Sequence, residues 1–416
     1  MKIGLIGLGT IGSGVVDILK NNSQLITNRT NTTIELAKIC DKNKDKAEKL
    51  GLADIYTEDY KEIINNPEIS VVIELIGGYE PARTIIIEAL QAKKHVVTAN
   101  KAVIAKHGKE IFKAAKENNV NILFEAAVGG CIPIIRSIRE SFAADNIHTV
   151  YGILNGTTNY ILTQMEEGMS YEEALKQAQE LGFAEADPSF DVDGLDSAQK
   201  LKIISSLAFN ANINQEILTW GITKISQNDI KYAKERGYTI KLLAIAKNIN
   251  NEIELRVHPT MIPNDHVLAG VRFEYNAVFV EGEGIGSSLL SGKGAGSLPT
   301  ATVVLGDVID LANNKKQEYY FEDKPIKDIN TITSRYYLRP QVLDKPGVFA
   351  KISKILGENN ISISGVSQKE LGKEIVPITI YTHEAKEKEM MNAVKEINQL
   401  DVVKEKTVVI RIEDLD

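Results

Sequence analysis

Cysteine is scarce in this sequence, and long apolar runs are absent. Cys40 and Cys131 are the two cysteines among 416 residues, which is too few for a disulfide framework or a cysteine-rich zinc site. No apolar run approaches the roughly 20 residues that span a bilayer. The opening MKIGLIGLGT lacks the long apolar core of a secretory signal. We therefore expect a cytoplasmic protein with no membrane partner.

A surplus of basic residues is missing as well. Lys and Arg number 48 against 56 Asp and Glu, which gives a formal net charge of −8. Proteins that bind nucleic acids usually carry a basic face, so no nucleic-acid partner is expected. Apolar residues make up 43% of the chain, enough to offset the entropy lost on folding. The length predicts two or three domains.

Strand-like and helix-like segments alternate through residues 1–132. This texture predicts an α/β fold in which a parallel sheet is covered by helices, a Rossmann-like dinucleotide-binding domain. The expected strands are Lys2–Ile6, Ile34–Ile39, Val71–Ile76, His95–Thr98 and Asn121–Phe124. The expected helices are Gly12–Asn21, Lys44–Leu50, Ala82–Ala92 and Lys109–Asn118.

Longer helices predict a mixed α+β domain over residues 133–297, and the family resemblance described below implies that this domain serves substrate binding and dimerisation. Its expected helices are Tyr171–Leu181, Leu195–Asn210 and Asp229–Lys247, and its expected strands are Thr149–Leu154, Glu252–His258 and Asn276–Glu281. Residues 298–312 are expected to form a helix that completes the first domain. A linker over 313–330 then leads to residues 331–416, whose strand–helix–strand–strand–helix–strand order predicts a small ferredoxin-like domain.

A glycine motif follows the first expected strand and opens the first helix. Its sequence is Gly7-Leu8-Gly9-Thr10-Ile11-Gly12. Such glycines allow a tight turn, close approach of the backbone to a pyrophosphate, and helix–strand packing, while the helix N-terminus offers amides to phosphates. The strand–helix context favours cofactor binding over a purely structural turn. The expected cofactor contacts are Gly7, Gly9, Thr10, Ile11 and Gly12.

The residues after the second expected strand bear on the choice of cofactor. Asp41 can accept hydrogen bonds from a ribose 2′-hydroxyl, which favours NAD. Lys42 follows directly and can instead pair with the 2′-phosphate of NADP. Asp41 is also open to a structural interpretation, as a solvated residue at a strand end. The sequence thus favours NAD and leaves NADP open.

Five carboxylates and a lysine gather in the segment Glu185–Lys200. A calcium loop is excluded, because placing Gly194 sixth puts Ser189 first and Lys200 last, where carboxylates are required. One remaining interpretation is a surface Asp196–Lys200 ion pair worth only tenths of a kcal/mol. The other is a functional site, in which the carboxylates receive a cationic group of a substrate while Lys200 transfers a proton.

Lys200 suits the role of a proton donor. The reference pKa of lysine is about 10.4, so the side chain is mostly charged at neutral pH and can protonate a developing alkoxide. To act as a base, Lys200 would need a pKa lowered by burial. Asp196, four residues earlier on the same helical face, opposes that lowering.

Taken together, these features resemble the homoserine dehydrogenase family, in its long form with a C-terminal ACT-type regulatory domain. No single motif is specific, but the combination and its order are. The matching stretches are Gly7–Gly12, Thr98–Ala102, Phe124–Pro133, Gly152–Tyr160, Glu185–Lys200, Val257–Thr260 and Gly294–Gly296.

The resemblance implies an activity and roles for residues. The reaction is the reversible, NAD(P)-dependent interconversion of L-homoserine and L-aspartate 4-semialdehyde, in threonine, methionine and isoleucine biosynthesis. Lys200 matches the acid/base lysine and Asp196 its substrate-binding neighbour, while Lys101 reaches both cofactor and substrate and is the other candidate for proton transfer. The remaining implied substrate contacts are Glu185, Asp191, Gly156 and Thr157, and the remaining implied cofactor contacts are Thr98 and Gly296.

A structural sodium ion is also implied by the resemblance. Its ligands would be the Glu125 side chain and the backbone carbonyls of Val128, Gly130 and Ile132, a set of oxygens that suits a hard cation. One position departs from the family, which often has a tyrosine where Phe183 stands. Any hydroxyl contact that the family makes from this position is therefore absent here.

The C-terminal domain has two open interpretations. ACT-type domains often bind an amino acid near the turn that corresponds to Asp344–Val348, so threonine, the end product, is a candidate effector. Alternatively, the domain only forms oligomers; a homodimer or homotetramer is expected in either case.

Two other functions compete with the dehydrogenase. A catalytically inactive, nucleotide-binding amino-acid sensor would have no use for Lys200. Cys131 could be the nucleophile of an enzyme that oxidises an aldehyde through a thioester, but packing explains it better. His258 is expected to be structural rather than catalytic.

Overall fold

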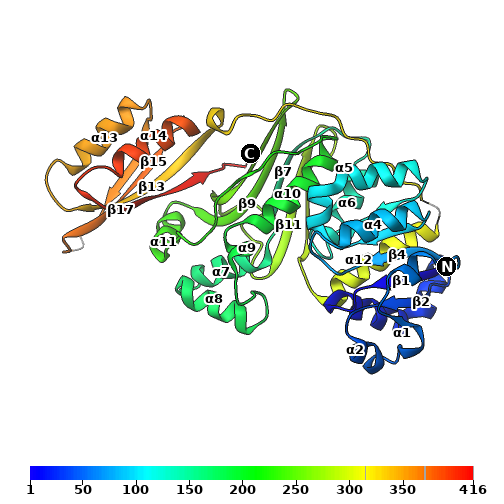
Figure 1. The fold of residues 1–416 in the computed structure, drawn as a ribbon. Helices are drawn as coiled ribbons and strands as arrows, with labels where there is room; N and C mark the ends of the chain where they lie inside the picture. The colour runs from blue at the N-terminus through cyan, green and yellow to red at the C-terminus, as the bar shows by residue number, and fades with distance from the viewer. Residues whose placement is uncertain (314, 370–371, 416) are drawn as a thin grey trace. The chain divides into compact units, whose positions relative to one another are not determined.

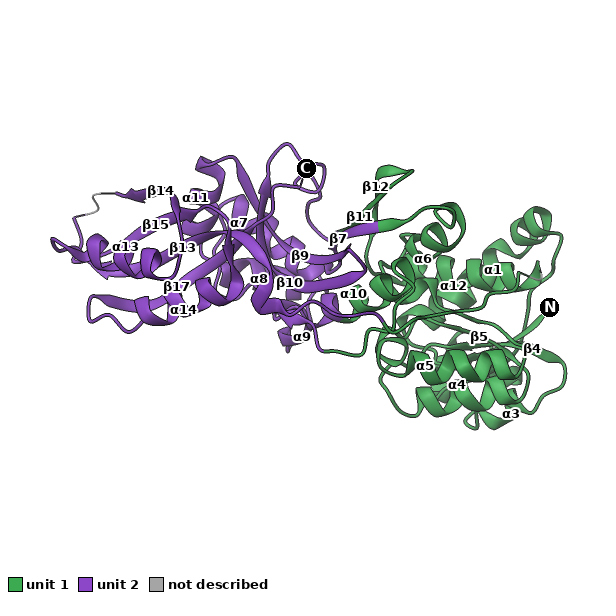
Figure 2. Cartoon of the chain, turned by 90° about the horizontal axis from the view of Figure 1, so that it is seen from above, with its two compact units in different colours: residues 1–147, 199–215, 276–323 green, residues 148–198, 216–275, 324–416 purple. Residues whose placement is uncertain are grey.

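The computed structural model describes residues 1–313, 315–369 and 372–415 (Figure 1). The chain divides into two compact units (Figure 2). Unit 1 comprises residues 1–147, 199–215 and 276–323, and unit 2 comprises residues 148–198, 216–275 and 324–416. Across the described residues, no helix has the length and apolar character needed to cross a membrane.

Unit 1 is built on a six-stranded parallel sheet with the strand order β3-β2-β1-β4-β5-β6. The apolar residues of its central strands are fully buried, as expected for a sheet covered on both faces. The strands are β1 (Lys2–Ile6), β2 (Glu35–Cys40), β3 (Tyr56–Thr57), β4 (Ile69–Glu74), β5 (His95–Thr98) and β6 (Ile122–Leu123). The connecting helices are α1 (Thr10–Thr30), α2 (Lys44–Lys49), α3 (Lys61–Ile64), α4 (Ala82–Gln91) and α5 (Lys101–Glu117).

A helix from much later in the chain packs against α1. It is α12 (Ser297–Ala312), and it is close because Gly14 has no side chain. A Cβ at Gly14 would lie 2.7 Å from Ser297 Oγ and 3.0 Å from the Ala301 Cβ. Apolar residues of both helices share one core cluster with the strands.

The connector after α12 has little regular structure but is anchored to unit 1. The ring of Tyr319 stacks on Phe112 at 4.4 Å between centroids, and its hydroxyl donates to the Ile122 carbonyl at 3.1 Å. Unit 1 also contains α6 (Ile134–Arg136) and β12 (Gly286–Lys293), which neighbours β11 (Tyr275–Gly282).

Unit 2 corrects one prediction from the sequence. Residues Asp229–Lys247 do not form a single helix, because α11 (Gln227–Glu235) ends early and β9 (Tyr238–Ile249) follows. Gly237, with φ of +80°, makes the turn between them. Residues 240–246 are all buried, and periodicity does not separate such an apolar run in a buried strand from one in a buried helix.

The remaining elements of the first part of unit 2 surround an antiparallel pair, β9 and β10 (Glu252–Pro263). Strand β7 (Ile147–Ile153) pairs with β9, and β8 (Leu218–Thr219) pairs with β10. The helices are α7 (Gly156–Glu166), α8 (Tyr171–Glu180), α9 (Ser189–Val192) and α10 (Leu195–Ala208), the last of which contributes residues to both units.

The C-terminal part of unit 2 has the predicted ferredoxin-like order. Its sheet runs β17-β13-β15-β14, with α13 and α14 packed on one face around a single apolar cluster. The elements are β13 (Thr333–Leu343), α13 (Val348–Glu358), β14 (Ile363–Gln368), β15 (Ile375–Thr382), β16 (Ala385–Lys386), α14 (Glu387–Ile397) and β17 (Val403–Ile412).

The C-terminal domain shares a sheet with the rest of unit 2. The end of β17 pairs in parallel with β10, joining Thr260 to Arg411 and Met261 to Ile412. Charged side chains are buried at this junction, and Arg256 lies between Glu254 and Glu413. The domain is therefore a structural extension of the β9–β10 sheet.

Candidate active site

The glycine motif in unit 1 forms an open cradle at the N-terminus of α1. Gly7 adopts φ of +102°, and a Cβ there would lie 2.7 Å from the Leu75 carbonyl oxygen, so a side chain is excluded. Nothing lies within 4 Å of a Cβ placed on Gly9. No side chain caps α1, which leaves its first amides available to an anion.

Asp41 fastens the end of β2 to this cradle. Its Oδ2 accepts a hydrogen bond from the Leu8 amide at 2.6 Å, and its Oδ1 accepts one from the Asn43 amide at 2.8 Å. Lys42 beside it is exposed. The carboxylate thus combines a structural task with a position at the edge where a dinucleotide fold presents its ribose contact.

In unit 2, one asparagine brings two of the predicted carboxylates together. Asn155 Nδ2 donates to Asp191 Oδ1 at 2.7 Å and to Asp196 Oδ2 at 2.9 Å. Its own Oδ1 accepts from the Thr158 amide at 2.8 Å and caps α7. No role for Asn155 is predicted from the sequence, although asparagine before a helix is a recognisable capping signal.

Thr157 also joins this cluster, whereas Glu185 does not. The Thr157 hydroxyl donates to the Phe183 carbonyl at 2.6 Å and approaches Asp191 Oδ2 at 3.3 Å. Glu185 is exposed, and among the described residues no hydrogen bond links its carboxylate to Asp191 or Asp196. Gly156 begins α7 next to them.

The two lysines predicted from the sequence as proton-transfer candidates both lie on helices. Lys200 is 9% exposed and follows Asp196, 4% exposed, by one turn of α10. Lys101 is the first residue of α5, directly after Asn100, whose Oδ1 accepts from the Val103 amide at 3.2 Å. Thr98 ends β5 and is fully buried.

The predicted sodium ligands lie in unit 1. Both Glu125 carboxylate oxygens accept backbone amides, from Ile135 at 2.8 Å and Arg136 at 2.7 Å. Burial raises the pKa of Glu125 to about 7. Gly130 lies so close to Gly294 that a Cβ would fall 2.5 Å from its carbonyl oxygen. The described residues contain no group of three or more His, Cys, Asp or Glu placed to hold a metal.

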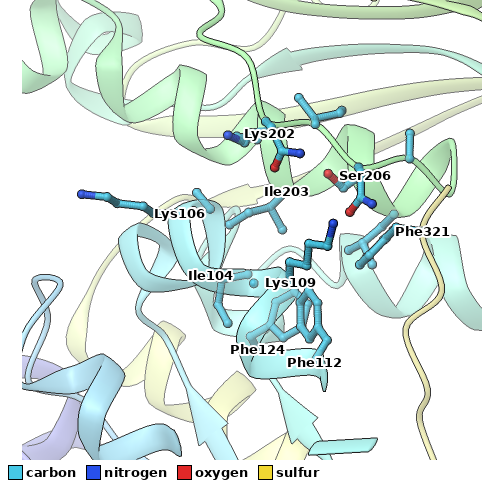
Figure 3. Close-up of a pocket in the computed structure, with 16 residues that line it drawn as sticks. Ile104, Lys106, Lys109, Phe112, Phe124, Lys202, Ile203, Ser206 and Phe321 are labelled. Carbon is cyan, nitrogen blue, oxygen red and sulfur yellow. The ribbon is translucent and has the colours of Figure 1, made fainter. Parts of the chain in front are cut away.

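A cavity of about 60 Å³ in unit 1 is separate from these residues. It lies between α5 and the end of α10 and has an apolar floor that includes Phe112 and Phe124. Lys109 extends into it and Lys106 points away (Figure 3). Burial lowers the pKa of Lys202, another lining residue. Neither Lys101 nor Lys200 lines the cavity.

Sequence-family models match three consecutive parts of the chain. The model described as "Homoserine dehydrogenase, NAD binding domain" matches residues 7–125, "Homoserine dehydrogenase" matches 133–309, and "ACT domain" matches 336–402. A homoserine dehydrogenase from Pseudomonas aeruginosa is 42% identical, with 100% of this chain and 99% of the relative covered. The chain belongs to the homoserine dehydrogenase family.

Other homoserine dehydrogenases agree over the full length. The enzyme from Bacillus subtilis is 39% identical, with 99% of this chain and 98% of the relative covered. A crystal structure of a homoserine dehydrogenase from Thiobacillus denitrificans has a TM-score of 0.93 at 42% identity and covers 100% of this chain and 99% of that one.

Membership of the homoserine dehydrogenase family settles the class of activity. The protein is an NAD(P)-dependent oxidoreductase that acts on a CH–OH group, and it carries a Rossmann-like cofactor domain and an ACT domain. These comparisons confirm the predicted fold and function, and nothing in them supports the inactive-sensor alternative. The roles of individual residues are a separate matter.

Proposed function

We propose that Lys200 transfers the proton while Asp191 and Asp196 hold the substrate ammonium in this homoserine dehydrogenase. The observation that carries the proposal is the pair of carboxylates held side by side by Asn155, with Lys200 one helical turn after Asp196. Two carboxylates that accept hydrogen bonds from the same amide nitrogen create a negative site that attracts a cation. Homoserine and aspartate semialdehyde each carry one ammonium group.

The reaction needs a proton where the cofactor exchanges a hydride. Bound NAD(P) supplies or accepts the hydride at the carbon that bears the oxygen. In the direction of reduction, the Lys200 ammonium protonates the developing alkoxide. In the direction of oxidation, the neutral amine takes the hydroxyl proton. Lys101 at the start of α5 is the second candidate for this step.

For the cofactor itself, the residues present fit a dinucleotide. The open space over Gly9 and the uncapped N-terminus of α1 suit a pyrophosphate. Gly7, Thr10, Ile11 and Gly12 complete that loop, and Gly296 precedes α12. Asp41 supports a preference for NAD, because a carboxylate already oriented by two amides opposes a 2′-phosphate.

Glu125 fits a hard monovalent cation by its chemistry. Its carboxylate is 4% exposed, and a cation beside it would stabilise the charged form that burial disfavours. Val128, Gly130 and Ile132 would add carbonyl oxygens. Replacing sodium by choline should lower the melting temperature of the wild-type protein more than that of Glu125→Gln, and equal shifts would contradict the site.

The ACT domain supports binding of an amino-acid effector, and we propose threonine. The turn before α13 is fixed to the next strand by Gln368, whose Nε2 donates to Asp344 Oδ1 at 3.0 Å. Threonine should inhibit the full-length enzyme. The threonine concentration that gives half-maximal inhibition should be higher for Gln368→Ala than for the wild-type protein. Identical curves for threonine, methionine and isoleucine would contradict this specificity.

We further propose a cytoplasmic homodimer or homotetramer. Exposed apolar side chains on two strands, Leu289 on β12 and Val366 on β14, are the kind of surface that a second copy covers. Light scattering of the purified chain measures the state directly.

The experiment that tests the catalytic proposal compares two lysines on one helix. Lys200→Ala should lower kcat for homoserine oxidation by about a thousandfold and leave the Kd for the cofactor within a factor of two. Lys202→Ala, two residues further along α10, is the matched control and should retain activity. If kcat is unchanged in Lys200→Ala but falls in Lys101→Ala, proton transfer is assigned to Lys101 instead.

A further inference from the structure

Glu74 is a fully buried carboxylate at the end of β4 that the proposed reaction does not use. The residues between β4 and α4, 75–81, are here called the β4–α4 turn. Glu74 Oε1 accepts hydrogen bonds from two amides of this turn, Ile76 at 2.8 Å and Gly77 at 3.3 Å. An acid at the end of an otherwise apolar strand persists only where its bonds compensate for burial.

The other oxygen of Glu74 is bonded to the neighbouring strand. Thr98 Oγ1, at the end of β5, donates to Glu74 Oε2 at 2.6 Å and accepts from the Asn100 amide at 2.9 Å. Asn100 Nδ2 returns to the turn by donating to the Gly78 carbonyl at 2.8 Å. These bonds form a closed ring that joins the β4–α4 turn to the start of α5, where Lys101 stands.

The same turn reaches the helix that carries Lys200. Gln199 Nε2, on α10, donates to the Tyr79 hydroxyl at 3.3 Å. Tyr79 also contacts α5: Lys106 Nζ lies 4.4 Å from its ring centroid, and the His107 ring packs edge-on at 6.3 Å. All of these residues belong to unit 1.

We propose that the β4–α4 turn sets the spacing between Lys101 and Lys200, with Glu74 as its anchor and Tyr79 as its contact to α10. Glu74 and Tyr79 are positioning residues, because they act through the two helices. The glycines at 77 and 78, both with φ of +73°, give the turn the shape in which both contacts form. This inference rests on the proposed function of the two lysines.

The amide of Gln199 adds a second observation. Its Oε1 is buried and has no hydrogen-bond partner among the described residues. Its Nε2 alone fixes the side chain, through Tyr79, directly beside Lys200 in the sequence. Loss of the Tyr79 hydroxyl therefore removes the one hydrogen bond that this amide makes among the described residues and lets the side chain rotate.

Tyr79→Phe and Glu74→Gln test the inference with little change in volume. Tyr79→Phe keeps the ring against α5 and removes only the hydroxyl. A misplaced catalytic group costs up to about a hundredfold in rate, so we expect kcat to fall about tenfold in each variant, with KM for homoserine within a factor of two. Homoserine deuterated at the carbon that is oxidised should show a larger isotope effect on kcat.

Matched controls are available in the same unit. Tyr60→Phe removes a hydroxyl bonded to Glu88 at 3.1 Å, and Glu62→Gln alters a carboxylate bonded to the Thr57 hydroxyl at 2.8 Å. Both should retain wild-type kcat and isotope effect. Melting temperatures of all four variants identify any loss that comes from unfolding.

A double-mutant cycle separates positioning from general damage. In the Lys200→Ala background, Tyr79→Phe should change residual kcat by less than twofold, because its effect passes through Lys200. An equal loss in both backgrounds, or full activity of Tyr79→Phe and Glu74→Gln, would overturn the inference. Wild-type kcat in both lysine variants would instead overturn the proposed function on which it rests.

Discussion

Arg256 on β10 and Glu413, just beyond β17, form an ion pair inside unit 2. Arg256 is 1% exposed and Glu413 is 7% exposed, and Glu254 completes the arrangement from the other side at 2.9 Å. The pair joins the β9–β10 part of unit 2 to the ACT domain. A buried pair is costly to break, because removal of one partner leaves the other charged in a medium of low polarity.

Glu413→Ala should therefore destabilise the protein strongly. We expect a loss of about 3 kcal/mol in the free energy of unfolding, typical of a buried pair that loses one member. Urea denaturation followed by circular dichroism measures it. Glu252→Ala, an exposed acid on the same strand β10, is the control and should lose less than about 0.5 kcal/mol. Equal losses would show that burial is not the cause.

His258 predicts how stability changes with pH. It is fully buried, its Nε2 lies 3.2 Å from Arg256 Nη1, and its Nδ1 lies 3.1 Å from the Pro259 carbonyl. Burial, Arg411 and Arg256 hold the pKa of His258 well below its usual value of 6.5. Below pH 6.5, His258 binds a proton in the unfolded chain but stays neutral in the folded chain. The free energy of unfolding therefore falls as the pH is lowered.

The measurement is the melting temperature between pH 8 and pH 5. Below pH 6.5, the melting temperature of the wild-type protein should fall further than the melting temperature of His258→Gln. Parallel curves for the two proteins would show that this histidine does not contribute to acid sensitivity.

Asn155 offers a test of the carboxylate pair. Asn155→Ala removes both amide bonds and the cap of α7, and we expect the KM for homoserine to rise about tenfold, with about 1 kcal/mol lost from stability. Asn155→Asp retains a capping oxygen but adds a third negative charge beside Asp191 and Asp196. Its stability should be restored relative to Asn155→Ala while kcat/KM falls further. The reverse order would contradict the electrostatic explanation.

Asp41 offers a test of cofactor choice. In Asp41→Ala the glycine motif loses its bond to Leu8, so kcat/KM should fall with both cofactors. The fall should be about tenfold larger with NAD than with NADP, because a ribose contact is lost and a repulsion of the 2′-phosphate is relieved. Asp45→Ala, on the exposed side of α2, is the control. Equal losses would assign Asp41 a structural role alone.

Local signals in the sequence predict the central strands of unit 1 but not β3, α3 or β12, and α5 begins at Lys101 rather than at Lys109. The expected strands Lys2–Ile6 and His95–Thr98 match β1 and β5 to the residue. A buried parallel strand is a short continuous apolar run, so it can be recognised from neighbouring residues alone. Glu74 lies inside the expected strand Val71–Ile76, and the sequence predicts no role for it. An acid at the end of an apolar run was its only signal.

Long-range pairing explains most of what the sequence did not reveal. The prediction of a helix over Asp229–Lys247 is wrong because the spacing of apolar residues does not distinguish a buried helix from a buried strand. Which of the two forms depends on pairing with a distant strand. Asn155 lies far in sequence from Asp191 and Asp196, so their contact depends on how α7 and α9 fold back. The pairing of β17 with β10 likewise has no local signal in the sequence, since residues 264–402 lie between the two strands.

The β10–β17 pairing also has a consequence for synthesis of the chain. Strand β10 emerges from the ribosome long before residues 403–412 exist. During that interval the Thr260–Met261 end of β10 lacks its β17 partner, and Arg256 has Glu254 but not Glu413 beside it. Completion of this sheet is thus a late event in biogenesis, and nascent chains that stall before β17 would present a vacant strand edge to chaperones or to one another.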